Sequence, residues 1–126
     1  MDSITVTRNA PAAANYYNKI GLAVYENDAN EVTLATSPTA VVPFGIITKA
    51  ENALGGQVTV CVAGRCKAEI GDTVTVGTHA LLAVAGDSRL DPAAAGDYTI
   101  ARYCSPQDGA DGEYRDVIIS ISQLDT

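Results

Sequence analysis

The middle of the sequence, from Gln57 to Gly77, consists of short runs of β-branched residues separated by glycines. Two adjacent segments, GGQVTVCVAGRCKAEI and GDTVTVG, carry Val, Thr and Ile in runs that end at a turn residue. Such runs, bounded by glycine turns, are typical of β-strands and are too short for stable helices. The pattern predicts a small all-β domain.

Turn signals recur along most of the chain at intervals of about 8–12 residues, the spacing of a sandwich or barrel. The pattern predicts a hairpin over Gly21–Ala35, a strand within Val41–Ala50, and further strands over 81–85, 97–103 and 117–121. Pro38 and Pro43 indicate an edge strand or a strand start, because proline donates no ladder hydrogen bond. We therefore expect a single-domain β-barrel or β-sandwich (β-tulip-like), with at most one short helix around residues 10–20.

Residues 1–19 show no clear hydrophobic period, apart from a short β-like run at Ser3–Thr7. We interpret them as a flexible N-terminal arm and residues 20–126 as the β domain. Asn15, Tyr16 and Tyr17 lie at the end of this arm, and aromatic side chains are favoured at the centres of interfaces. They are the candidate contacts with another subunit, although tyrosine is equally ordinary core material.

The run around Ala63–Gly64 predicts a two-residue hairpin turn in which Cys61 faces Cys66. Residues in such a non-hydrogen-bonded pair lie about 4.5 Å apart at Cα, the short end of disulfide geometry. A cross-strand disulfide and a pair of reduced thiols both fit, because cytosolic thiols stay reduced whereas thiols outside the cell meet an oxidising medium.

The net charge of −7 and the scattered basic residues argue against binding to nucleic acid or to anionic membranes. The N-terminus lacks the basic start and apolar run of a signal peptide, so we expect synthesis in the cytoplasm. Nothing in the sequence approaches the roughly 20 apolar residues of a membrane span.

No motif for catalysis or for a cofactor is recognisable. Cys61, Cys66, Cys104 and His79 supply four zinc-ligand types, but without CxxC or HxxxH spacing. The acidic stretch 108–113 lacks the order of ligands of an EF-hand and is interpreted as solvated turns. We therefore expect no metal, no cofactor and no enzymatic activity.

The order of strands and turn glycines resembles the small capsid decoration (cement) proteins of tailed bacteriophages over residues 40–121. The matching segments are Phe44–Ile47, Val58–Val60, Gly64, Ala68–Val74, Gly96–Arg102, Gly112–Glu113 and Val117–Ser120. The resemblance implies a compact β-barrel or β-sandwich that binds the outside of an expanded head, commonly as a homotrimer. It also implies that the partner is the major capsid protein, whose subunits the protein bridges, and that the protein resides on the exterior of the virion.

Two other classes of protein are compatible with parts of the sequence. Segment 68–77 is similar to the turn of lipoyl- or biotin-carrier domains, but the nearest hairpin tip carries no lysine. A carbohydrate-binding β module of a virion or host-recognition protein would use exposed aromatic residues, for which Tyr98, Tyr103 and Tyr114 are the candidates.

Overall fold

The computed structural model describes residues 3–27, 30–77 and 79–123, which form ten β-strands and contain no helix. The strands of the first half are β1 (Ile4–Asn9), β2 (Ala23–Glu26), β3 (Val32–Leu34), β4 (Gly45–Ala50) and β5 (Gln57–Ala63). Those of the second half are β6 (Arg65–Glu69), β7 (Leu81–Val84), β8 (Leu90–Pro92), β9 (Tyr98–Tyr103) and β10 (Tyr114–Gln123). The predicted all-β class is confirmed.

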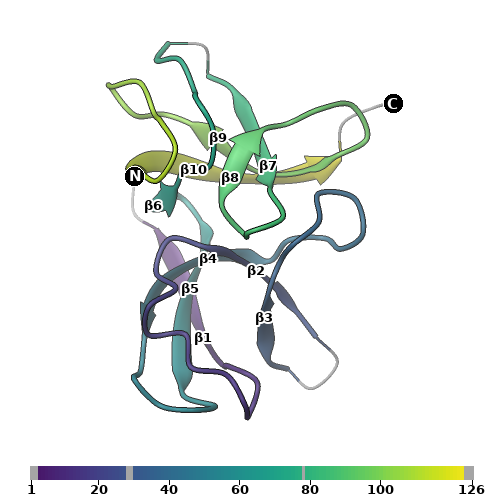
Figure 1. The fold of residues 1–126 in the computed structure, drawn as a ribbon, viewed down its shortest axis with the longest axis vertical. Coiled ribbons are helices and arrows are strands. Elements are labelled where there is room, and N and C mark those ends of the chain that lie inside the picture. Colours follow the sequence, from purple (N-terminus) through teal and green to yellow (C-terminus); the bar gives the residue numbers. More distant parts are fainter. Residues whose placement is uncertain (1–2, 28–29, 78, 124–126) are drawn as a thin grey trace.

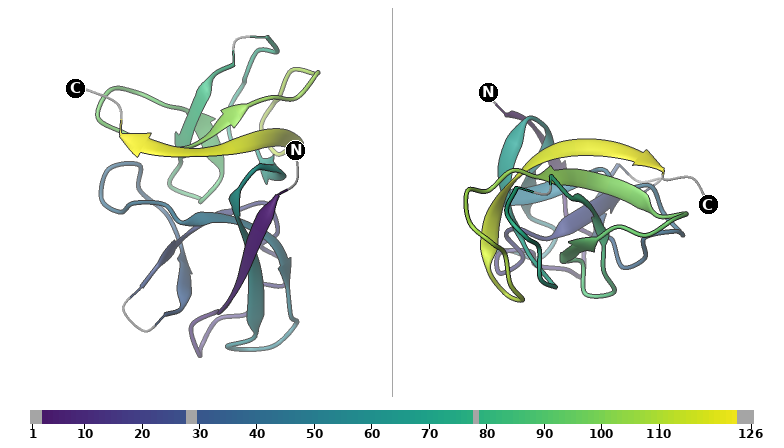
Figure 2. Two further views of the ribbon diagram at one scale, coloured as in Figure 1. Left: turned by 180° about the vertical axis from the view of Figure 1, so that it is seen from behind. Right: turned by 90° about the horizontal axis from the view of Figure 1, so that it is seen from above.

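The strands form two five-stranded antiparallel sheets, one from each half of the chain. The order is β1-β5-β4-β2-β3 in the first sheet and β6-β10-β9-β7-β8 in the second. Figure 1 shows the second sheet above the first, and Figure 2 shows the long, bent strand β10 crossing the molecule near the level where they meet. The sheets do not close into a barrel, so of the two predicted architectures the structure is sandwich-like.

The strands of the predicted central hairpin, β5 and β6, do not pair with each other. β5 pairs with β1 and β4, whereas β6 pairs with β10, and the chain passes from one sheet to the other at Gly64. Gly64 adopts a φ of 81°, a left-handed conformation that favours glycine. The predicted facing of Cys61 and Cys66 across a two-residue turn is therefore wrong, because the glycine turns the chain into a second sheet instead of back along the first.

Several other predicted elements are confirmed. β2 and β3 form the predicted hairpin, with Tyr25 opposite Thr33, although its turn residues 28–29 lie outside the described residues. β4 begins two residues after Pro43 and lies between β5 and β2, so the proline marks a strand start and not an edge. Residues 10–20 form turns and no helix, although the sequence allowed one short helix there.

The central strands of the first sheet are buried on both faces. Ala23 and Ile46 face a large core cluster shared with the second sheet, whereas Val24 and Ile47 face a smaller cluster under the N-terminal loop. Adjacent buried residues are expected where a strand is covered on both sides. The first sheet is thus the middle layer of the molecule.

Residues 3–19, expected to be a flexible arm, pack against the first sheet. β1 pairs with β5 along its whole length, and the Ala10 N–H donates a hydrogen bond to the Gly56 carbonyl (3.0 Å). Ala10 and Tyr16 belong to the smaller core cluster. The β-like run at Ser3–Thr7 indicates a strand in the sequence, but the sequence does not show which strand it pairs with.

Candidate interaction surfaces

Asn15 and Tyr17 lie on an exposed loop that is fastened to the loop connecting β4 and β5. The Asn15 side-chain amide donates to Asn52 Oδ1 (2.8 Å), the Asn15 Oδ1 accepts from the Tyr17 N–H (2.9 Å), and the Gly55 N–H donates to the Ala14 carbonyl (2.9 Å). These bonds hold two loops side by side at one end of the first sheet. We call residues 14–17 and 51–56 together the tip.

The tip presents two large side chains to solvent, Tyr17 at 51% exposure and Leu54 at 69%. Leu54 was not singled out from the sequence, although an apolar residue within the polar, glycine-rich run Glu51–Gly56 is a signal for an exposed contact. A rigid loop that holds an aromatic and an aliphatic side chain in water is suited to binding another protein surface.

Tyr16, the third candidate contact, is buried in the core instead of lying on the surface. It is 6% exposed, and its hydroxyl accepts a hydrogen bond from the Leu34 N–H (3.3 Å). Burial raises the pKa of the Tyr16 hydroxyl, while the hydrogen bond from Leu34 acts in the opposite direction. The ring therefore fills the smaller core cluster and supports the loop from which Tyr17 projects.

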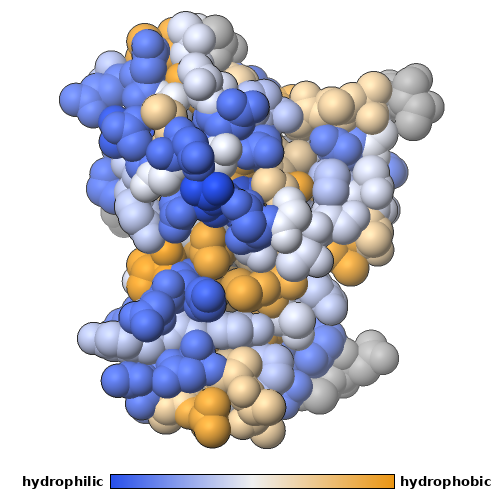
Figure 3. All heavy atoms as spheres, viewed as in Figure 1, coloured by the Kyte–Doolittle hydropathy of each residue, from blue (hydrophilic) through white to orange (hydrophobic). Residues whose placement is uncertain are grey.

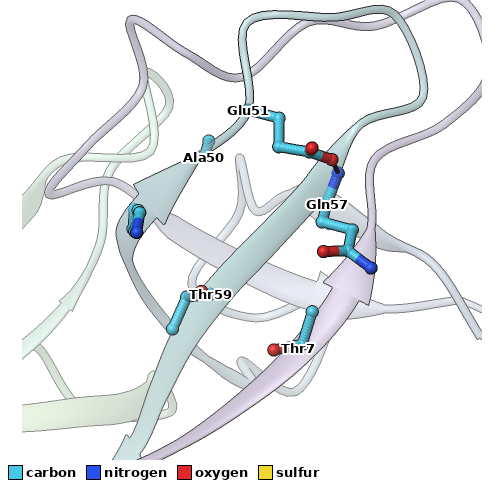
Figure 4. Close-up of a pocket in the computed structure, with 6 residues that line it drawn as sticks. Thr7, Ala50, Glu51, Gln57 and Thr59 are labelled. Carbon is cyan, nitrogen blue, oxygen red and sulfur yellow. Dashed lines mark hydrogen bonds between the residues drawn. The ribbon is translucent and has the colours of Figure 1, made fainter.

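A shallow polar groove of about 280 Å³ lies beside the tip, on strands β1, β4 and β5 (Figure 4). It is lined by Thr7, Lys49, Ala50, Glu51, Gln57 and Thr59. Glu51 accepts a hydrogen bond from the Gln57 N–H (2.6 Å), which closes the loop between β4 and β5. Hydroxyl, amide and ammonium groups here can bond to a polar partner surface, but they form no nucleophile–base pair.

A second groove, of about 380 Å³, lies between the two sheets and is mainly apolar. We call it the waist groove, and it is lined by Ser3, Ile20, Ile47, Thr48, Arg65, Cys66, Lys67 and Tyr114. Figure 3 shows apolar side chains gathered at the level where the two sheets meet. The sequence could not predict this groove, because its lining comes from five separate segments.

The three cysteines form no disulfide in the structure, and they lie near the crossing between the sheets. Cys61 is buried, and Cys66 and Cys104 are half-buried. Burial, together with the neighbouring Cys61 thiol, raises the pKa of Cys66 well above that of an exposed thiol. Oxidation of Cys61 and Cys66 to a disulfide stays a prediction. It now rests on the proximity of the two thiols, because the two residues do not face each other in a hairpin.

Arg89, beside the end strand β8, is surrounded by acidic side chains. Its Nε donates to Asp87 (2.7 Å), its Nη1 bonds to Asp111, and Glu69 lies 3.5 Å away. Burial raises the pKa of Asp87, but the hydrogen bonds and charge of Arg89 outweigh it and leave that pKa lowered. The cluster ties the β7–β8 turn to the acidic loop before β10 and is structural.

The remaining candidate ligands do not gather. His79 is exposed before β7 with a φ of 50°, and Glu113 accepts from the Ala110 N–H (2.8 Å) within the acidic loop. In the described part of the chain, no group of three His, Cys, Asp or Glu side chains is placed to hold a metal ion. Nor does that part contain a helix long and apolar enough to cross a membrane.

The three tyrosines considered for sugar binding are not equivalent. Tyr103 is buried in the larger core cluster, and its hydroxyl donates to the Gln107 carbonyl (2.5 Å). Tyr98 is half-buried, and only Tyr114 is exposed. They do not form an exposed aromatic platform.

Comparison with known proteins finds a similar structure but no similar sequence. No family model and no curated protein matches the sequence. Among solved structures, the fold is similar to the head fiber gp8.5 N base of bacteriophage phi29, with a TM-score of 0.67 and 19% identity. The match covers 98% of this chain and 100% of that one, so the two share one fold over their whole lengths.

Proposed function

We propose that this protein is a non-enzymatic structural protein of a bacteriophage virion, located on the outside of the head. The observation that carries the proposal is the full-length likeness to the base of a phage head fiber. The sequence resemblance to capsid decoration proteins indicates the same location by an independent route. Both point to a protein that is attached to a head and whose work is binding.

The surface of the molecule supports a binding role. The tip holds Tyr17 and Leu54 in water on two loops that are hydrogen-bonded to each other, so little conformational entropy is lost when they are covered. The polar groove of Figure 4 lies next to them and supplies hydrogen-bonding groups around an apolar centre. This combination matches the apolar centre and polar rim of protein interfaces.

In this proposal the partner is the major capsid protein, and the protein stabilises the head by bridging its subunits. Each contact is small, but repetition around a symmetric shell multiplies weak contacts into firm attachment. A homotrimer would place several tips on one site. The acidic net charge of −7 keeps unattached copies apart in solution.

The test is to mix the purified protein with expanded capsids that lack it, pellet the particles, and measure bound copies and the melting temperature of the particles. We expect saturable binding at a fixed ratio to the capsid subunit, and a raised melting temperature. The double variant Tyr17→Ala/Leu54→Ala should bind less, whereas Val76→Ala, which removes an exposed side chain elsewhere, should bind normally. Absence of binding by the unaltered protein would refute the proposal.

A further inference from the structure

The outer edge of β6 has backbone groups that point into the waist groove. β6 is an end strand of the second sheet, paired with β10 on one side only. Along a strand the hydrogen-bonding direction of the backbone alternates from residue to residue. The Glu69 N–H donates outward to the Gly21 carbonyl (3.0 Å), whereas the Ile70 N–H donates toward the β10 side, to the Glu113 carbonyl (2.8 Å). The backbone N–H and C=O groups of Arg65 and Lys67 therefore point outward, as those of Glu69 do.

The β10 side of the pairing gives the same answer. Lys67 lies opposite Asp116 in the register, but the Asp116 carbonyl accepts from the Cys104 N–H (3.1 Å), on the far side of β10. Asp116 and Lys67 are thus a non-hydrogen-bonded pair. The N–H and C=O of Lys67 are directed away from the sheet, at a groove that Lys67 itself lines.

One end of this edge already receives a segment of the chain. Gly21 bonds to Glu69 through its carbonyl and to the Ile47 carbonyl through its N–H (2.8 Å), so it bridges β6 and β4. Beyond it, toward Arg65, the edge continues without a strand beside it among the described residues. An exposed strand edge of this kind is a template for an added strand.

The charges around the groove indicate which partner fits. Arg65 is exposed, and it forms no ion pair with the described residues. The Lys67 side chain is 67% exposed, and its ion pair with Asp116 (3.0 Å) is of the solvent-exposed kind that exchanges partners at little cost. On a chain of net charge −7, two cations beside an apolar groove favour an acidic segment.

We infer that the outer edge of β6, with the waist groove, binds an extended acidic segment of the capsid subunit as an added β-strand. The segment's backbone bonds to Arg65 and Lys67, its carboxylates meet their side chains, and its apolar residues lie against Ile20 and Tyr114. The inference rests on the proposed function and deepens it, because it names a second contact, separate from the tip.

The first test alters the edge without altering the pairing with β10. Lys67→Pro removes an outward N–H, and proline is tolerated on the free side of an edge strand. Lys67→Ala is the matched control that removes the same charge and keeps the N–H. We expect Lys67→Pro to weaken binding to capsids at least tenfold and Lys67→Ala by a smaller factor. Equal binding by both variants would overturn the added strand.

The second test concerns charge and does not depend on the proline variant folding. Arg65→Glu/Lys67→Glu should weaken binding to capsids at least tenfold at low salt, with less difference at high salt, because salt screens exposed charges. Arg102→Glu, a charge reversal at an exposed residue of β9 that lines neither groove, is the matched control and should bind close to normally. Normal binding by the double variant would overturn the acidic partner.

The third test uses Cys66, which lines the groove, as a reporter. Alkylation by a maleimide, located by peptide mass spectrometry, should slow at least tenfold at Cys66 when capsids are bound, while Cys104, outside the groove lining, reacts at its usual rate. Binding to capsids with Cys66 unprotected would overturn the inference and leave the proposed function standing. Protection of Cys66 without capsids, in a dimer seen by sedimentation, would assign the groove to a second copy.

Discussion

Replacing Gly21 by alanine should destabilise the protein by an amount that can be divided into two causes. Gly21 has a φ of 89°, which costs a residue with a Cβ about 1–2 kcal/mol. The new Cβ would lie 2.5 Å from Tyr114 Cε1, so the ring must swing outward and lose its hydrogen bond to Glu69, worth about 1 kcal/mol. The total is about 2–3 kcal/mol.

This energy converts to a measurable shift in melting temperature. Unfolding entropy near about 2.1 cal/mol/K per residue gives about 0.26 kcal/mol/K for 126 residues, or roughly 4 °C per kcal/mol. Gly21→Ala should therefore lower the melting temperature by roughly 8–11 °C in calorimetry or circular dichroism. Gly77→Ala, with a φ of 83° and no atom within 4 Å of the new Cβ, isolates the backbone cost and should lower it by roughly 4–8 °C.

A double-mutant cycle separates the steric part. In a Tyr114→Ala background, Gly21→Ala should cost only as much as Gly77→Ala, because no ring remains to be displaced. Gly86→Ala, at a position with neither positive φ nor a close neighbour, should be near neutral. The proposed contact between residue 21 and Tyr114 is refuted if Gly21→Ala has the melting temperature of the unaltered protein. It is also refuted if Gly21→Ala loses as much unfolding free energy in the Tyr114→Ala background as in the unaltered protein.

Three further predictions concern single side chains. Tyr16→Ala should lose about 3–5 kcal/mol of unfolding free energy in denaturant titration, whereas Tyr17→Ala should stay within about 0.5 kcal/mol; similar losses would contradict the assignment of one ring to the core. Thr99→Val removes a buried hydroxyl that donates to the Ser120 carbonyl (2.9 Å) and should cost about 1–2 kcal/mol in the same assay, a neutral effect being the contrary result. Burial and the charges of Asp72 and Asp87 raise the pKa of Asp91, whose Oδ1 is buried without a hydrogen-bond partner among the described residues. The charged carboxylate therefore destabilises the fold above that pKa, and this penalty disappears once the carboxyl is protonated below it. Asp91→Asn should thus raise the melting temperature at pH 7 and lose this advantage at pH 3, and an equal gain at both pH values would contradict the assignment.

The sequence predicted the local elements of the fold better than their partners. β2 and β3 pair with each other and are separated in the sequence by only a short polar stretch, so local periodicity was enough to identify the hairpin. The crossing at Gly64 has the same local pattern as a hairpin, namely two β-branched runs around a glycine. Which of the two forms depends on β1 and β10, which supply the strands that β5 and β6 pair with.

The candidate surfaces show the same limit. Asn15 and Tyr17 were identified as exposed contacts from their position in an irregular segment, and they do lie on the surface. Tyr16 is adjacent in sequence but buried, and a segment without periodicity gives no means of telling the two rings apart. The waist groove brings Ile20, Arg65 and Tyr114 together from distant segments, and this depends on the tertiary structure alone.

The division of the chain at Gly64 has a consequence for synthesis on the ribosome. All strands of the first sheet precede the glycine, so that sheet can pair while the second half is still being translated. At about 5–20 residues per second, residues 65–123 take about 3–12 seconds to appear. During this time Ala23, Ala35 and Ile46 have no second sheet to cover them. The nascent chain is therefore open to chaperones, or to premature association with other nascent copies, in that interval.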